Sequence, residues 1–344
     1  MSLVVLTFRD ITTLIYMEET MNLLKKVAIL FVSFSFVAVS TVSAKEFSPK
    51  KPIELIIMAG QGGGADEIAR LVQGIAEKND FTSKPLIPIN KPGGSGGEAL
   101  TYVKGKSGDQ HTIMITLNSF FTTPQNQTEL GINILEDYTP LARLLTDTFM
   151  VWIKKDGAKT SGINTLDEFL ARAKQGDLVA GGTGKMSEDE LLLGMMRGMF
   201  GFDAKYVPYS GGGAVAKGLI GGESDFTLNN PSEQMGFYQS GDSKALVMMT
   251  PKRNPAFPEV PSSYELGYPE LEYYMMRAFV APADIGAEAQ KYYTGVLHDV
   301  YMNAEFQKFN IDDGKLLSWI EGYGLTDFFA VEYDKHTDIV AAFN

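Results

Sequence analysis

The stretch that decides the fold is residues 51–66, which read KPIELIIMAGQGGGAD. Its first half, 53–59, is a nearly continuous apolar run, typical of a strand that is buried on both faces of a sheet. A glycine-rich turn then leads into 66–78, where apolar residues recur at helical spacing. A buried strand, a glycine turn and an amphipathic helix in this order predict an α/β unit built around a parallel strand.

The same alternation of strands and helices continues along the chain. Capping boxes at 165–168 (TLDE) and 187–190 (SEDE) mark the starts of two helices. The order indicates α/β domains with mainly parallel sheets, and 344 residues favour two domains. Further strands are predicted over 86–89, 112–117, 149–153, 178–180, 205–209, 225–228, 245–250 and 276–281.

Four glycine-rich turns contain most of the functional information: 60–65 (GQGGGA), 92–97 (PGGSGG), 181–186 (GGTGKM) and 211–213 (GGG). The first and third each lie between a predicted strand and a predicted helix. Free backbone N–H groups and the positive end of a helix dipole suit an anion at such a turn. Glycines also make tight turns for purely structural reasons. Two such loops in different halves of the chain nevertheless favour a shared binding cleft.

The first turn also fits the dinucleotide-binding pattern G-x-G-x-x-A. However, the second strand ends at Asn90, where an NAD site needs an acid, and Asp66 places a carboxylate where pyrophosphate would bind. A P-loop is disfavoured because Gly184-Lys185 is followed by Met186 rather than by Ser or Thr. These residues count against nucleotide chemistry, and we expect no cofactor.

Composition excludes several other classes of function. The formal charge of −12 argues against nucleic-acid binding, which needs a basic face. The absence of cysteine excludes disulfides, thiolate metal sites and cysteine nucleophiles. The three histidines, His111, His298 and His336, are far apart in sequence and lack metal-ligand spacing, so we expect no metal site.

Residues 21–44 (MNLLKKVAILFVSFSFVAVSTVSA) have the pattern of a secretory signal peptide. Lys25 and Lys26 precede an apolar run over 27–40, and small residues precede a cleavage position after Ala44. The apolar run is shorter than the ~20 residues that span a bilayer. We therefore expect the natural start at Met21, removal of residues 1–44, and an exported, soluble protein.

Four segments together resemble the Bug, or TctC-like, family of extracytoplasmic receptors of tripartite tricarboxylate transporters. They are 51–66, 89–100 (INKPGGSGGEAL), 207–213 (VPYSGGG) and 249–271 (MTPKRNPAFPEVPSSYELGYPEL). The resemblance covers residues 50–344. It implies an α/β, type II periplasmic-binding-protein fold, in which two lobes close on a ligand.

The resemblance also implies how the chain is divided into lobes. The first lobe is expected to comprise 45–147 and 252–344, and the second 148–251, with hinges near 147–152 and 250–254. The function implied is that of a periplasmic receptor and not of an enzyme. It would capture a small carboxylate, most simply a di- or tricarboxylate, and deliver it as a monomer to membrane permease subunits.

The family's ligand contacts, carried over to this chain, fall on loops of both lobes. Lys185, the cation of the second-lobe loop, is expected either to pair with a second ligand carboxylate or to remain solvated. Asp66 is expected to cap loop amides, and the capping box gives Glu190 a structural role. The predicted ligand-binding residues are Gly60, Gln61, Gly62, Gly63, Gly64, Asp66, Asn118, Ser119, Gly182, Thr183, Gly184, Lys185, Ser187, Asn229 and Asn230.

Two alternative functions remain open at this point. An exported enzyme could use the cleft for hydrolysis or group transfer, although no nucleophile–base–acid set occurs at recognisable spacing. A ligand-sensing partner of a membrane sensor kinase would share the same binding site and differ in its docking surface.

Overall fold

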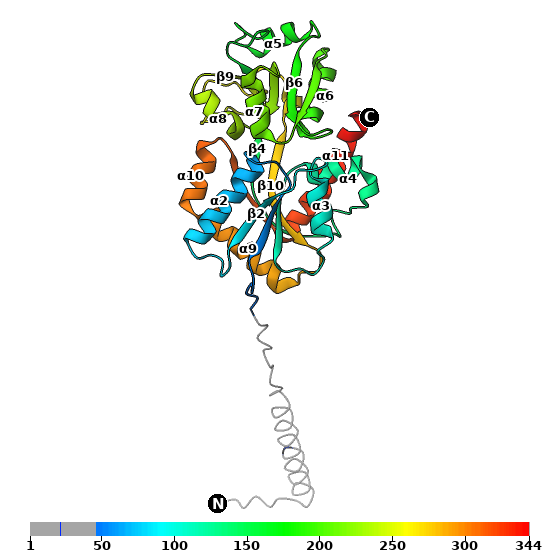
Figure 1. Ribbon diagram of the computed structural model, residues 1–344, viewed down its shortest axis with the longest axis vertical. Helices are drawn as coiled ribbons and strands as arrows, with labels where there is room; N and C mark the ends of the chain where they lie inside the picture. Colours follow the sequence, from blue (N-terminus) through cyan, green and yellow to red (C-terminus); the bar gives the residue numbers. More distant parts are fainter. Residues whose placement is uncertain (1–20, 22–45, 344) are drawn as a thin grey trace, which may run out of the picture. The chain divides into compact units, whose positions relative to one another are not determined.

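Two β-sheets form the centre of the protein, here described from a computed structural model that covers Met21 and residues 46–343 (Figure 1). The six-stranded sheet has the order β11-β4-β10-β3-β1-β2, and the five-stranded sheet has the order β7-β6-β8-β5-β9. Both belong to one unit, Phe47–Asn344. The predicted signal-peptide region, residues 1–44, lies outside the described residues apart from Met21.

We call the six-stranded sheet and its helices the first lobe. Its central strands are continuous apolar runs because helices cover both faces, as the sequence predicted for β1. The strands are β1 (Ile53–Ile57), β2 (Leu86–Asn90), β3 (Thr112–Thr116), β4 (Tyr138–Thr148), β10 (Tyr274–Pro282) and β11 (Leu316–Glu321). The helices are α2 (Gly64–Lys78), α3 (Gly97–Lys104), α4 (Ser119–Asn126), α9 (Ala287–Met302), α10 (Ala304–Asp312) and α11 (Gly322–Phe343), with a short 3-10 turn η1 (Thr128–Leu130).

The five-stranded sheet and its helices form the second lobe. Helix α5 begins with the predicted capping box, in which Thr165 and Glu168 each accept the other's backbone N–H. The strands are β5 (Met150–Lys154), β6 (Val179–Thr183), β7 (Lys205–Tyr209), β8 (Phe226–Asn229) and β9 (Ser243–Met248). The helices are α5 (Leu166–Ala173), α6 (Glu188–Phe200), α7 (Gly212–Gly221) and α8 (Pro231–Gln239).

The expectation of mainly parallel sheets is wrong. Within the described chain, β1 pairs in parallel with β2 and β3, and β6 with β7 and β8, whereas the five remaining strand pairings are antiparallel. The antiparallel pairs involve the strands through which the chain passes between the lobes. Those strands run antiparallel to the neighbouring strands of the βαβ units in each sheet.

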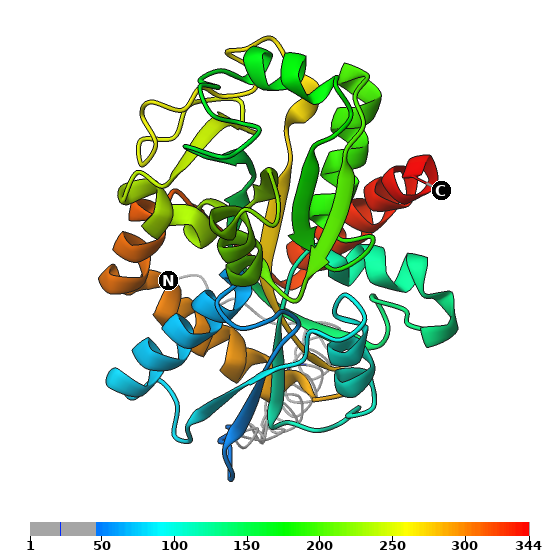
Figure 2. The ribbon, with the colours of Figure 1, turned by 45° about the horizontal axis from the view of Figure 1, so that its top comes forward.

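The chain crosses between the lobes through β4 and β5, which are separated by the single residue Phe149. It returns through β10, which runs between the two halves of the molecule (Figure 2). Between β9 and β10, Ser263 donates its N–H to the carbonyl of Met248, and Phe257 packs on Trp152. Residues 249–271, with the short turn η2 (Pro269–Leu271), therefore associate with the second lobe. We propose to keep the predicted lobe division, with its second boundary moved from 251/252 to about residue 273.

Candidate ligand-binding cleft

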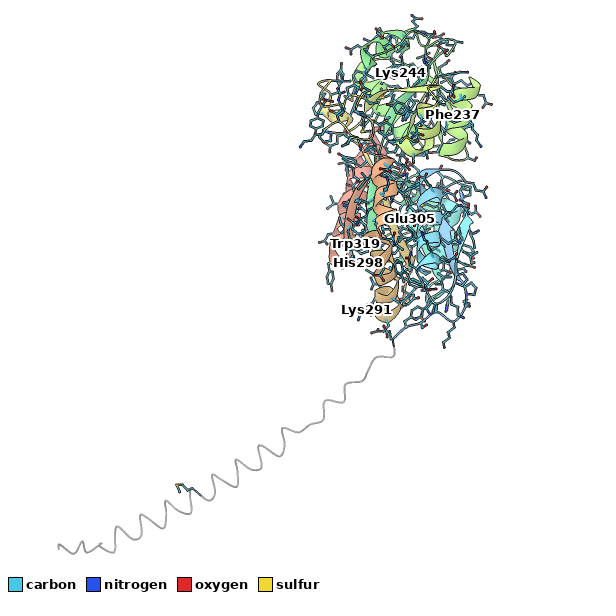
Figure 3. All side chains as sticks on the ribbon, turned by 90° about the vertical axis from the view of Figure 1, so that its left-hand side faces the viewer. Phe237, Lys244, Lys291, His298, Glu305 and Trp319 are labelled. Atoms are coloured by element: carbon cyan, nitrogen blue, oxygen red, sulfur yellow. The ribbon has the colours of Figure 1, made fainter. Side chains whose placement is uncertain are left out.

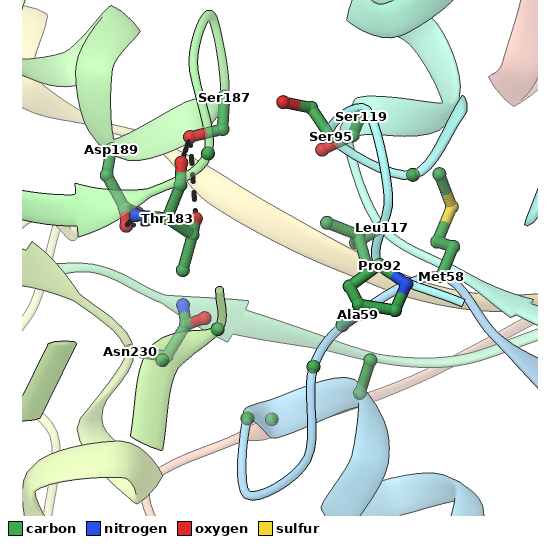
Figure 4. Close-up of a pocket in the computed structure, with 18 of the residues that line it drawn as sticks. Met58, Ala59, Pro92, Ser95, Leu117, Ser119, Thr183, Ser187, Asp189 and Asn230 are labelled. Carbon is green, nitrogen blue, oxygen red and sulfur yellow. Dashed lines mark hydrogen bonds between the residues drawn. The ribbon is translucent and has the colours of Figure 1, made fainter. Parts of the chain in front are cut away.

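A cavity of about 90 Å³ lies between the two lobes (Figure 4). First-lobe residues of its wall include Pro92, Ser95 and Ser119, and second-lobe residues include Thr183 and Ser187. The volume is several times what one water molecule needs, so the cavity has room for a small ligand.

Five helices point their first turns at this cavity. Helices α2 and α4 of the first lobe contribute Gly64 and Ser119 to the wall, and α6, α7 and α8 of the second lobe contribute Asp189, Gly212 and Glu233. The first N–H groups of a helix have no partner within the helix, and its dipole is positive at that end. The convergence of these N-termini favours an anionic group in or beside the cavity.

Eight of the fifteen residues predicted for ligand binding lie on the wall of this cavity. They come from the first-lobe glycine loop, from the start of α4, from the second-lobe loop and from the end of β8. They are Gly60, Gly63, Gly64, Ser119, Thr183, Gly184, Ser187 and Asn230.

Three residues of the first loop lie away from the wall. Gln61 and Gly62 are exposed, and Gly62 has a φ of +74°, which a glycine adopts without strain. Asp66 accepts the N–H of Gly62 at 3.0 Å and also hydrogen bonds to Arg70 and Asn90. Asp66 thus caps the loop, as its position at the helix start suggested.

Of the four remaining predicted residues, three have structural contacts and one is exposed. Gly182 lies within β6, where a Cβ would come 2.6 Å from that of Asp189. Lys185 is exposed. Asn118 donates to the carbonyl of Tyr274 at 2.7 Å, and Asn229 accepts from Thr227 at 2.6 Å.

Glu190 has a structural contact, although the predicted capping box at 187–190 does not form. Its carboxylate accepts the N–H of Met186 at 2.6 Å, rather than that of Ser187. The hydroxyl of Ser187 makes no cap hydrogen bond and donates to the carbonyl of Thr183. Glu190 is not on the cavity wall.

The glycine turn at 211–213 contacts the first-lobe loop, a relationship that the sequence reasoning missed. A Cβ on Gly60 would overlap the carbonyl of Ser210, and a Cβ on Gly213 would lie 2.7 Å from the carbonyl oxygen of Gly62. The two lobes can approach this closely only where both backbones lack side chains. Ser95 makes a separate contact between the lobes by donating its hydroxyl hydrogen to the carbonyl of Lys185 at 2.8 Å.

Glu233 is the most informative residue that sequence reasoning missed. One carboxylate oxygen accepts the N–H of Gly64, at the start of α2, at 3.1 Å, and the other accepts the N–H of Asn230 at 3.2 Å. A Cβ on Gly212 would overlap the same carboxylate. Burial raises the pKa of Glu233 to about 7. The sequence does contain a signal for this residue: Asn230 and Glu233 in NPSE (230–233) have the spacing of a capping box, which predicts a helix start there.

Two further buried carboxyl groups lie at the start of α6. Glu188 accepts the hydroxyl hydrogen of Ser119, across the lobe boundary, at 2.9 Å. Asp189 accepts from the backbone N–H of Thr183 at 2.6 Å and from its hydroxyl at 3.1 Å. Burial raises the pKa of both carboxyl groups above their ordinary values.

Arg277 is the cation of the cavity wall. Its Nη2 donates to Asp147 and to Asn230, both at 2.9 Å, and its side chain is only 2% exposed. Gly64 packs directly against the guanidinium group, where a Cβ would overlap it. Arg277 Nε has no hydrogen-bond partner among the described residues.

The three histidines lie away from the cavity wall. His111 accepts the N–H of Lys50 at 3.1 Å. His298 packs edge-on against Trp319 on the face in view in Figure 3, and His336, a residue of α11, stacks against Phe121. The wall therefore lacks a histidine that could act as the base of a hydrolytic triad.

Two α/β lobes, joined by crossing strands around a cavity at converging helix N-termini, define a periplasmic-binding-protein fold, as the sequence predicted. The chain belongs to the TctC family: the model of the tripartite tricarboxylate transporter family receptor matches residues 68–343. The predicted family is thus confirmed. No helix among the described residues is both long and apolar enough to span a bilayer.

Individual proteins support the same family and fold. Protein BugT of Bordetella pertussis is 23% identical over 266 residues, which are 76% of this chain and 80% of BugT. MatC of Rhodopseudomonas palustris, solved with malate, is 21% identical with a TM-score of 0.77 and covers 85% of this chain and 99% of its own. A second R. palustris protein, solved with adipate, is 19% identical with a TM-score of 0.77, covering 86% and 97%.

Proposed function

We propose that this protein is a periplasmic receptor that captures a small carboxylate between its lobes and delivers it to the permease subunits of a tripartite transporter. The observation that supports the proposal best is the convergence of five helix N-termini, from both lobes, on one cavity. We assign the ligand contacts to the eight predicted residues on the wall and to Arg277. The signal peptide would direct export and be removed after Ala44, and the receptor would act as a monomer.

The ligand class expected from the sequence is a di- or tricarboxylate. Two relatives of the same fold were solved with malate and with adipate, which are dicarboxylates. The test is a thermal-shift screen of mono-, di- and tricarboxylates. A ligand present at 100 times its Kd stabilises the folded protein by about 2.7 kcal/mol. No shift with any carboxylate at millimolar concentration would reject the proposal.

Binding would close the lobes by rotation about the crossing segments. Phe149 is the single residue between β4 and β5, and the chain returns to the first lobe through β10. Small-angle scattering of the protein, with and without a ligand from the screen, should give a smaller radius of gyration with ligand. An unchanged radius at saturation would argue against closure on binding.

Delivery to a permease has its own test. Deletion of the receptor gene and deletion of the genes of a tripartite permease should each abolish cellular uptake of the carboxylate found in the screen. Uptake that persists without the permease genes would reject the transport role while leaving carboxylate binding intact. The same experiment would then favour the sensing role.

A further inference from the structure

Acidic side chains outnumber basic side chains on the cavity wall. Among the described residues the charged side chains on the wall are Asp189, Glu233 and Arg277. Glu188 lies directly beside Asp189, and Asp147 already pairs with Arg277 at 2.9 Å. The wall thus offers one guanidinium group, already paired, against several buried carboxyl groups. A ligand that carries two carboxylates would find no second cation there.

Two groups of opposite charge retain unused hydrogen-bonding capacity. Both bonds from Thr183 to Asp189 end on Oδ2, and Oδ1 receives none from the described residues. Nε of Arg277 likewise donates to no described residue, although the side chain is buried. A buried donor or acceptor without a partner is unfavourable, so both groups favour a ligand that would satisfy them.

We propose that the ligand is an amino carboxylate, whose carboxylate is bound by Arg277 and whose ammonium group is bound by Asp189 with Glu233 nearby. This inference rests on the proposed function and narrows its ligand class. In Figure 4, Asp189 and Thr183 lie on the side of the cavity opposite Ser95 and Ser119, so a small ligand would contact both lobes at once. Closing the lobes would then require both charges of the ligand.

The surroundings of Asp189 determine how protons move on binding. The titratable groups that face it are Glu188 on α6, Glu233 on α8, Tyr206 on β7 and Tyr273 just before β10. Burial raises the pKa of Asp189 well above its ordinary value, which opposes ionisation of this carboxyl group. An ammonium group beside it would favour the ionised form, so we expect ligand binding to be coupled to release of a proton.

Matched pairs of ligands provide the test. L-aspartate and succinate differ by the amino group, as do L-alanine and propanoate, and 4-aminobutanoate and butanoate. Calorimetry should show, in at least one pair, an amino member that binds about tenfold or more tightly than its partner, because a charged hydrogen bond contributes about 1.5–3 kcal/mol. Proton release should appear as a binding enthalpy that differs between phosphate and Tris buffers.

Variants then assign the effect to one carboxyl group. Asp189→Asn keeps an oxygen for Thr183 but removes the charge, and should reduce the preference within that pair to less than about twofold. Glu190→Gln is the matched control, because Glu190 is the next residue of α6 and lies off the wall. This control should leave the preference unchanged.

The outcomes separate the two proposals. Equal or tighter binding of the members without an amino group, with no proton release, would overturn the amino-carboxylate proposal and leave the receptor function standing. Failure of every carboxylate to bind would reject both. If Asp189→Asn does not fold, the proposal is still tested by two measurements on the wild-type protein: its preference for the amino member of each ligand pair, and the release of a proton on binding.

Discussion

Gly64, at the start of α2, donates its N–H to the carboxylate of Glu233 on α8 across 3.1 Å, and the two residues belong to different lobes. The bond therefore exists only where the lobes are together. It places a carboxylate of the protein at a helix N-terminus, in the position that suits the carboxylate of a ligand. Glu233 consequently links closure of the lobes to pH.

The first prediction concerns that link. Because the pKa of Glu233 is about 7 in the folded protein and 4.5 ordinarily, the folded form binds the proton more tightly. The resulting stability is fully present below pH 4.5 and is lost as the pH rises through 7. It amounts to about 3 kcal/mol, and Glu233→Gln should remove this pH dependence. Denaturant unfolding of both proteins between pH 4.5 and 8 measures it.

The control is Glu190→Gln, which removes a carboxylate from the second lobe without touching the wall. Glu190→Gln should retain the slope of the wild-type protein. Parallel curves for Glu233→Gln and wild type would show that Glu233 does not titrate in this range.

The second prediction concerns the backbone contact between the lobes. A methyl group on Gly60 would overlap the carbonyl of Ser210, so Gly60→Ala should hold the lobes apart while each lobe folds normally. Ligand affinity should fall by about tenfold or more, because the closed form becomes rare. Gly74→Ala is the control: its methyl group meets open space in α2, so stability should rise by about 0.5–1 kcal/mol with unchanged affinity. Equal affinities of both variants would contradict the steric argument.

The third prediction concerns a buried hydrogen-bond chain. The hydroxyl of Tyr273 lies 2.9 Å from Nε2 of His336 and accepts from Asn118 at 3.1 Å. Nδ1 of His336 lies 2.7 Å from the carbonyl of Glu332, so Nδ1 carries the hydrogen and Nε2 accepts from Tyr273. Tyr273→Phe should lower the free energy of unfolding by about 1–3 kcal/mol. Tyr323→Phe changes a residue that is 91% exposed and should have no effect. Equal losses of stability in the two variants would show that the buried hydrogen bonds of Tyr273 do not stabilise the fold.

The fourth prediction gives the pH dependence of the same chain. Burial lowers the pKa of His336 from 6.5, with Glu332 and Lys335 as its charged neighbours. A lowered pKa in the folded state means that its contribution to stability is present above pH 6.5 and is lost as the pH falls through the lowered value. The stability advantage of wild type over His336→Gln should therefore shrink with acid. If the stability advantage of wild type over His336→Gln instead grew below pH 6.5, the pKa of His336 would be raised in the folded protein rather than lowered.

The fifth prediction compares two ion pairs. Asp147 and Arg277 are buried on either side of their 2.9 Å contact, so Asp147→Asn leaves a buried charge uncompensated and should destabilise the fold by about 3–5 kcal/mol. Asp177, which pairs with Arg172 near the surface, provides the comparison. Asp177→Asn should change stability far less than Asp147→Asn, because solvent screens the exposed pair. Similar losses in both variants would show that burial does not set the difference.

The sequence allowed most of the fold to be predicted, because buried parallel strands have a local signal. Apolar runs identified β1, β3 and β8 almost to the residue. It did not reveal β4, where Arg143 and Asp147 interrupt the apolar pattern. Both charges are tolerated only because distant residues pair with them, and no local pattern reports such partners.

The cleft was only partly predictable for the same reason. The loop that contains Gly60 has a strong local signature, and it does reach the cavity wall. Glu233 and Arg277 acquire their roles from partners more than 100 residues away, such as Gly64 and Asp147. Lys185 was chosen for its charge, but the second-lobe loop turns its side chain toward solvent, and a positive φ of 53° follows at Met186.

The strand order also fixes the sequence in which the protein can fold as it is made. All strands of the second sheet lie between residues 150 and 248, so this sheet is complete while the first is still unfinished. In the first sheet, β4 pairs with β10 and β11, both of which come later in the chain. Until β10 is available, β4 has no described neighbour in its sheet, and such an unpaired edge is prone to wrong association. A chain shortened to residue 248 would therefore retain the second sheet and leave only β1, β2 and β3 of the first paired.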